Sequence, residues 1–188
     1  MTHEIIIAGF GGQGVLSLGK ILAYAGIMQD KEVSWMPSYG PEMRGGTANV
    51  TLILSDERIS SPYLKLFDIA IALNQQSVDK FEETVKPGGV LLYDTNGITH
   101  HPTREDIRIY KIDGSKLASS LGNKKIYNMV ILGALLKIDP IINEENILKG
   151  LKKSLPERYH HLIPLNQEAI SLGMNNCNPV NLEETATS

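Results

Sequence analysis

The chain has 188 residues, of which 42% are hydrophobic, and this length is typical of a single domain. Its 18 Lys and Arg residues stand against 21 Asp and Glu residues, a net charge of −3. Nucleic-acid binders and polybasic membrane-surface proteins both need a basic excess, so this balance argues against both classes. A chain of this size can bury a core without disulfides or a structural metal.

The number of cysteines and the length of the apolar segments exclude further classes of protein. The sequence has 1 cysteine, Cys177. A single thiol cannot form an internal disulfide, a four-cysteine iron–sulfur cluster or a zinc ribbon, so any such cluster must lie on another chain. The longest stretch without charged residues, 5–19, is glycine-rich and shorter than the ~20 apolar residues of a membrane span. No Lys or Arg precedes it, as one would in a signal peptide, and we expect a cytoplasmic protein.

The N-terminal third predicts a strand, a helix and a second strand. Residues 4–9 form a β-branched run without alternation, typical of a strand buried on both faces. Apolar residues spaced along Val15 to Ala25 predict a helix. Residues 32–36 predict the second strand, ended by Pro37. The unit has the size of a βαβ crossover.

The rest of the chain predicts alternating strands and helices, followed by a helical region. Strands are expected at 47–54, with an antiparallel return at 58–60, and at 67–73, 90–93 and 107–112. Helices are expected at 75–85, stopped by Pro87-Gly88-Gly89, at 117–121, at 127–138, after a capping Asn143, and in a last segment ending at Gly173.

These elements predict one α/β domain over residues 1–173. We expect a Rossmann-like open, mostly parallel sheet with flanking helices, one hairpin and a helical C-terminal part. Residues 174–188 are rich in Asn, Thr and Glu and are expected to form an extended or disordered tail.

The first candidate site is the glycine loop after the first strand. Gly9, Gly11 and Gly14 match G-x-G-x-x-G between a strand and a helix, with Gly12 and Gln13 between them. Glycines let the backbone approach a ligand, and the amides at the helix start favour an anion. An anion or cofactor contact and a tight turn packed on a partner chain both fit. NAD or FAD is disfavoured, because the second strand does not end in the acid that a dinucleotide site uses.

The second candidate site is the loop that follows the second strand. Its prolines and glycines exclude a helix or strand, and ligands of open α/β sheets lie beyond the carboxyl ends of strands. Arg44 before two glycines suits an anion. Alternatively, Glu42 and Arg44 pair with each other or with another subunit. The candidate residues of this loop are Ser38, Tyr39, Gly40, Glu42, Arg44, Gly45 and Gly46.

The remaining candidates carry weaker signals. Asn74 follows a predicted strand and can contact a ligand, although capping the next helix is the favoured role. The pairs His100-His101 and His160-His161 are expected at the surface. We find no set of nucleophile, base and orienting group, so the chain alone does not resemble a complete enzyme.

Taken together, these motifs resemble the gamma subunit of the 2-oxoacid:ferredoxin (acceptor) oxidoreductases. The resemblance is detailed over residues 5–94 and looser up to Gly173. The amino-acid sequence from Tyr39 to Gly46 resembles that of the 2-oxoglutarate and branched-chain members more than that of the pyruvate members. The segments that carry the resemblance are Gly9 to Val15, Pro37 to Asn49, Ser60 to Pro62, Asp68 and Asn74.

The resemblance implies a multisubunit enzyme that oxidatively decarboxylates a 2-oxoacid, with 2-oxoglutarate favoured. It implies thiamine diphosphate, Mg²⁺ and [4Fe-4S] clusters in the complex, ferredoxin as electron acceptor and coenzyme A as acyl acceptor. The expected partners are alpha and beta subunits and a ferredoxin-like delta subunit, whereas this chain carries no redox centre and is inactive alone. The two glycine-rich loops and Asn74 would close the active site or contact the phosphates of coenzyme A or thiamine diphosphate.

Two alternatives remain open at this point. A free-standing dinucleotide-binding oxidoreductase would hold NAD or FAD at the glycine loop. A non-catalytic anion-binding or interaction module would bind a small anion there, and the isolated chain would form a homodimer.

Overall fold

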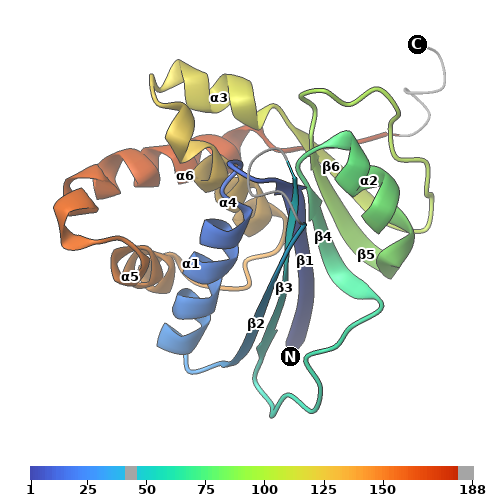
Figure 1. The fold of residues 1–188 in the computed structure, drawn as a ribbon, viewed down its shortest axis with the longest axis horizontal. Coiled ribbons are helices and arrows are strands. Elements are labelled where there is room, and N and C mark those ends of the chain that lie inside the picture. Colours follow the sequence, from blue (N-terminus) through green and yellow to red (C-terminus); the bar gives the residue numbers. More distant parts are fainter. Residues whose placement is uncertain (41–45, 182–188) are drawn as a thin grey trace.

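The computed structural model describes residues 1–40 and 46–181. Within them, a sheet of 7 strands has the order β2-β3-β1-β4-β5-β6-β7 (Figure 1). The strands are β1 (Thr2–Phe10), β2 (Glu32–Tyr39), β3 (Thr47–Ser55), β4 (Phe67–Ala72), β5 (Val85–Asp94), β6 (Arg108–Ile112) and β7 (Asn178–Pro179). The helices are α1 (Val15–Met28), α2 (Gln75–Phe81), α3 (Gly114–Ser120), α4 (Tyr127–Ile138), α5 (Glu144–Ser154) and α6 (Ile163–Asn176). Short 3₁₀ turns occupy η1 (Glu82–Thr84), η2 (Lys124–Ile126) and η3 (Glu157–Leu162).

The centre of the sheet is parallel and its margins are antiparallel. Strands β1, β4, β5 and β6 run parallel to their neighbours in this series. Strand β3 runs antiparallel between β1 and β2, and β7 runs antiparallel to β6. The predicted open, mostly parallel sheet with flanking helices is therefore confirmed. Since the parallel strands all end at the same edge, the loops that follow them gather there.

Helices cover the two faces of the sheet unequally. Figure 1 shows α1, α3, α4, α5 and α6 on one side of the sheet and α2 on the other. The larger apolar core joins β1 and β3 to α1, α4 and α5, with Ile7, Leu22, Leu52 and Leu132 each 0% exposed. The smaller core packs α2 against β4 and β5 through residues such as Val78 and Leu91. Among the described residues, no helix is long and apolar enough to cross a bilayer.

A hairpin is present, but the prediction that residues 47–54 and 58–60 form it is wrong. The hairpin is formed by β2 and β3, which pair from Glu32↔Ser55 to Tyr39↔Ala48, and residues 56–66 contain no strand. Asp56 instead binds the Nζ of Lys31 and the terminal ammonium of Met1, both at 2.7 Å, and these contacts hold the chain where it leaves β3.

Two predicted boundaries are also wrong, both at prolines. Pro37 lies inside β2 rather than ending it. Within the described part of the chain β2 pairs only with β3, and an edge strand tolerates the missing amide of a proline. Pro87 lies inside β5, because α2 ends at Phe81 and a 3₁₀ turn leads directly into the strand. A register shift between Phe67 and Ile69 of β4 accommodates this irregular start.

The last helix continues to Asn176 instead of ending at Gly173. After it, Asn178 and Pro179 pair with Lys111 and Tyr110 of β6. The beginning of the expected tail is therefore helix and sheet edge, whereas residues 182–188 lie outside the described residues. The other helices agree with expectation: α4 spans 127–138, and the side chain of Asn143 caps α5 by accepting the amide of Asn146. The assignment of residues 1–173 to a single domain stays a prediction.

Helices α4 and α6 approach each other through glycines. A Cβ at Gly133 would overlap the carbonyl oxygen of Ile170, and a Cβ at Gly173 would overlap that of Val130. The two helix backbones therefore touch directly, and neither position has room for a methyl group.

We predict that Gly133→Ala lowers the free energy of unfolding by about 2 kcal/mol or more. The overlap with a backbone carbonyl outweighs the ~1 kcal/mol that alanine gains over glycine in a helix. Urea unfolding measures this change. Lys137→Ala, at an exposed position of the same helix, is the control and should stay within about 0.5 kcal/mol of wild type. A G133A protein as stable as wild type would contradict the close packing.

Candidate functional site at the carboxyl edge of the sheet

The carboxyl ends of the parallel strands bring polar residues from distant parts of the chain to one edge. The glycine loop follows β1, Asn74 follows β4, Asn96 follows β5, and Ser115 lies in the first turn of α3 after β6. This edge is where open α/β sheets bind ligands.

The glycine loop leads into a helix start whose first amides have no acceptor within the helix. Gly12 and Gly14 have φ angles of 99° and 76°, in the left-handed region that favours glycine. Gly14 is the N-terminal cap of α1, and its carbonyl accepts the amide of Leu18 at 2.9 Å. The amides of the first turn of α1 precede this bond and have no acceptor within the helix. They form a positive helix terminus suited to an anion.

The side chain of Gln13 connects β1 to β4. Its Oε1 accepts the amide of Phe10 at 2.6 Å, and its Nε2 donates to the carbonyl of Leu73 at 2.9 Å. The same oxygen lies 2.6 Å from the point that a Cβ at Gly9 would occupy. Gly9 is therefore required for the Gln13 bridge, and the bridge fixes the loop against the neighbouring strand.

The structure brings Gly46, at the end of the second glycine-rich loop, to the first. The amide of Gly11 donates to the carbonyl of Gly46 at 2.9 Å, and the amide of Gly40 donates to Thr47 at 2.7 Å. Ser38 and Tyr39 end β2, and Tyr39 is 61% exposed. The predicted site residues Glu42, Arg44 and Gly45 lie outside the described residues.

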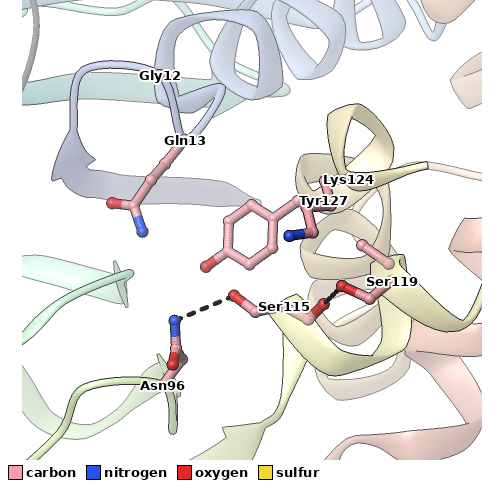
Figure 2. A pocket seen from close by; sticks show the side chains of 8 residues that line it. Gly12, Gln13, Asn96, Ser115, Ser119, Lys124 and Tyr127 are labelled. Carbon is pink, nitrogen blue, oxygen red and sulfur yellow. Dashed lines mark hydrogen bonds between the residues drawn. The ribbon is translucent and has the colours of Figure 1, made fainter. Parts of the chain in front are cut away.

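Two clefts flank the glycine loop. The amide cleft, of about 280 Å³, lies over the start of α1 and is lined by Phe10, Gly11, Gly12, Gly14, Val15, Leu16, Ser17, Tyr39 and Ala48. The hydroxyl cleft, of about 300 Å³, is lined by Gly12, Gln13, Asn96, Ser115, Ala118, Ser119, Lys124 and Tyr127. Gly12 borders both clefts, and a Cβ there would meet nothing within 4 Å. Figure 2 shows the Tyr127 ring between Gln13 and Lys124, with Asn96 and Ser115 below it.

Asn74 caps α2, as the sequence predicted. Its Oδ1 accepts the amide of Ser77 at 2.8 Å, and the residue is 6% exposed. Among the residues that the structure describes, its Nδ2 has no hydrogen-bond partner. A buried donor without an acceptor is costly, and Asn74 lies at this edge of the sheet without lining either cleft.

A buried carboxylate that the sequence patterns did not indicate lies beneath the hydroxyl cleft. Asp94, at the end of β5, is 0% exposed and accepts the hydroxyl of Tyr127 at 2.6 Å. Burial raises the pKa of Asp94, although hydrogen bonds from Tyr127 and from the amides of Asn96 and Gly114 act in the opposite direction. Burial raises the pKa of Tyr127 as well, and the negative charge of Asp94 adds to this shift.

The remaining titratable groups do not assemble a metal or thiol site. Across residues 1–40 and 46–181, no group of three or more His, Cys, Asp and Glu side chains is placed to hold a metal ion. Burial raises the pKa of Cys177 to about 11, so the thiol is protonated at neutral pH.

The strand arrangement differs from a dinucleotide-binding sheet beside the glycine loop. In a dinucleotide-binding sheet, the second strand is the parallel neighbour of the first and supplies the acid that holds the ribose. Here the antiparallel strand β3 is that neighbour, and Thr47 lies opposite Phe10. The fold thus defines an open α/β domain in which the glycine loop leads from β1 into the N-terminus of α1.

The chain belongs to the pyruvate ferredoxin/flavodoxin oxidoreductase family, whose model matches residues 4–176. The 2-oxoglutarate synthase subunit KorC of Methanocaldococcus jannaschii is 38% identical over 160 residues, which cover 84% of this chain and 86% of that one. The ketoisovalerate oxidoreductase subunit VorA of Methanothermobacter thermautotrophicus is 37% identical over 150 residues, 79% of this chain and 31% of that one. The chain thus spans less than a third of the VorA relatives that it matches.

Solved structures share the fold. The gamma subunit of a keto/oxoacid ferredoxin oxidoreductase from Geobacter sulfurreducens matches with a TM-score of 0.80 and 29% identity, covering 94% of this chain and 96% of that one. The 2-oxoglutarate:ferredoxin oxidoreductase from Magnetococcus marinus, with 2-oxoglutarate, coenzyme A and succinyl-CoA bound, matches with a TM-score of 0.83 and 27% identity. That match covers 93% of this chain and 30% of the other. The resemblance inferred from the sequence motifs is confirmed at the level of the family.

We predict that Gln13→Glu lowers the free energy of unfolding by about 1–3 kcal/mol at neutral pH. The carboxylate still accepts the amide of Phe10, but its second oxygen faces the carbonyl of Leu73 instead of donating to it. A protonated carboxyl donates again, so the loss should shrink between pH ~8 and pH ~4.5. Chemical denaturation at both pH values tests this. Gln167→Glu, at a half-buried position of α6, is the matched control.

Proposed function

We propose that this chain is the gamma-type subunit of a multisubunit 2-oxoacid:ferredoxin oxidoreductase. The complex would oxidatively decarboxylate a 2-oxoacid to an acyl-CoA and reduce ferredoxin. The observation that carries this proposal is the match, over most of both chains, to separate small subunits of such enzymes. The partners would be alpha and beta subunits and a ferredoxin-like delta subunit, with thiamine diphosphate, Mg²⁺ and the [4Fe-4S] clusters bound by those chains.

Within the complex, we assign this chain the task of holding coenzyme A at the carboxyl edge of its sheet. Coenzyme A carries a diphosphate and a ribose phosphate, and the amide cleft offers the free amides and positive terminus of α1. The unpartnered Nδ2 of Asn74 adds a donor at the same edge. The Magnetococcus marinus relative binds coenzyme A, which supports this choice of ligand. Gly11, Gly12, Gly14, Tyr39 and Arg44 are the residues proposed to contact it.

Among 2-oxoacids, 2-oxoglutarate is the proposed substrate. The Tyr39 to Gly46 sequence resembles that of 2-oxoglutarate and branched-chain enzymes. The relatives carry the names of 2-oxoglutarate, ketoisovalerate and pyruvate enzymes, so the substrate has to be measured. A free-standing NAD or FAD enzyme is the weaker alternative, because β3 occupies the place next to β1 where the second dinucleotide-binding strand would lie.

The proposal is tested by an anaerobic pull-down of the tagged chain from its native cells. We expect co-purified chains with cluster cysteines and a thiamine site, and coenzyme A-dependent reduction of ferredoxin or a viologen dye. Pyruvate, 2-oxoglutarate and 2-oxoisovalerate are compared as substrates, and the highest kcat/KM is expected for 2-oxoglutarate. A partnerless, inactive protein would refute the proposal. Preference for another acid would refute only the substrate assignment.

Arg44→Ala in the complex should raise the KM for coenzyme A by about tenfold or more and leave the KM for the 2-oxoacid unchanged. A guanidinium that binds a phosphate forms charge-assisted hydrogen bonds, which alanine removes. Arg58→Ala is the matched control, because Arg58 is exposed in the loop between β3 and β4 and borders neither cleft. If R44A left both KM and kcat for coenzyme A at wild-type values, Arg44 would have no role in binding it.

A further inference from the structure

Asp94 connects the elements that line the hydroxyl cleft. Its Oδ2 accepts the hydroxyl of Tyr127 at 2.6 Å and that of Ser115 at 3.4 Å. Its Oδ1 accepts the amide of Asn96 at 3.1 Å. These donors belong to the loop after β5, to the first turn of α3 and to the first turn of α4.

The carboxylate is fully buried and these contacts surround it. Asp94 is 0% exposed and Tyr127 is 8% exposed. Neither residue was singled out by the sequence, and Asp94 does not itself line the cleft. Its hydrogen bonds reach the cleft only through residues that do, and one of these, Asn96, also donates to Ser115 at 3.3 Å (Figure 2).

We propose that Asp94 is a positioning residue that fixes the wall of the hydroxyl cleft opposite the glycine loop. Three segments from different parts of the chain can form one wall only if something holds them in register, and the two side-chain oxygens of Asp94 accept a hydrogen bond from each. The side chains of Asn96, Ser115 and Tyr127 then face Gln13 and Gly12 across the cleft. This inference rests on the proposed function in one respect: the ligand whose affinity reports on the wall is coenzyme A, which would reach the hydroxyl cleft past Gly12, a residue that borders both clefts.

Asn in place of Asp94 keeps the size of the side chain but not its bonding. The Oδ1 of Asn can still accept the Asn96 amide, but its NH₂ group would have to donate to the Tyr127 hydroxyl, which reverses the 2.6 Å hydrogen bond. An N–H···O bond is longer than an O–H···O bond, so the tether to Tyr127 would loosen while the core around it stays filled.

Asp94→Asn in the purified complex should raise the KM for coenzyme A about tenfold and leave kcat within about twofold. Tyr127→Phe removes the other partner of the 2.6 Å hydrogen bond and should have the same effect. The double variant should be no worse than the more severe single variant, because both changes break one interaction. Asp113→Asn is the matched control: Asp113 caps α3 through the amide of Lys116, and Asn caps equally well.

A residue that merely supports folding would give a different pattern. Asp94→Asn would then lower the yield of complex and the kcat per enzyme while the KM for coenzyme A stayed at its wild-type value. That result, or additive effects of the two single variants, would overturn the proposal. A wild-type complex without coenzyme A-dependent activity would instead refute the proposed function.

A second measurement needs no ligand and separates these cases. Amide hydrogen exchange in the full chain should accelerate in D94N at residues 95–97 and 114–116, and leave the glycine loop at 11–14 unchanged. Unchanged exchange at both segments would overturn the positioning role even if the complex were inactive.

Discussion

The antiparallel placement of β3 beside β1 is the constraint on which the site depends. Because β3 starts opposite the end of β1, with Thr47 paired to Phe10, Gly46 lies next to the loop after β1. The hydrogen bond from Gly11 to Gly46 closes this junction. A parallel neighbour would have carried its own preceding loop to the far end of the sheet. The same arrangement leaves no parallel second strand beside β1 to supply the acid that holds a ribose, so one feature of topology both creates the amide cleft and disfavours NAD or FAD.

The hydroxyl cleft, on the other side of the glycine loop, depends on a buried carboxyl group and not on strand order. Asp94 ends β5 inside the protein, and a carboxylate there needs donors to offset its lost hydration. Tyr127 is the nearest such donor, and this requirement ties the start of α4 to the parallel core of the sheet. Three of the residues that line the hydroxyl cleft thus satisfy one buried carboxyl group.

The sequence predicted elements well where a single pattern dominated. The apolar stripe of 127–138 gave the bounds of α4, and the capping roles of Asn74 and Asn143 followed from their place before a helix. Prediction failed where contacts with residues distant in the sequence determine whether a segment forms a strand. Pro37 is tolerated only because β2 lies beside β3 alone, and the return strand at 58–60 is missing because Asp56 bonds Lys31 and Met1 instead. Asp94 and Ser115 carried the same signal as Asn74, a polar residue after a strand, and were not recognised.

Two of the three glycines in the G-x-G-x-x-G motif are required by packing against neighbouring side chains and not by contact with a ligand. Position 9 requires glycine because the Gln13 carboxamide occupies the space of a side chain there. Position 14 requires glycine because a Cβ would lie 2.9 Å from the side chain of Asn128. Gly12 differs from both, since its missing side chain opens onto empty space between the two clefts. A G-x-G-x-x-G match after a strand therefore identifies a fold with a tight first turn. The ligand has to be argued from the neighbouring strand, the free amides and the polar groups across the cleft, and here those features favour a phosphate-bearing ligand other than NAD or FAD.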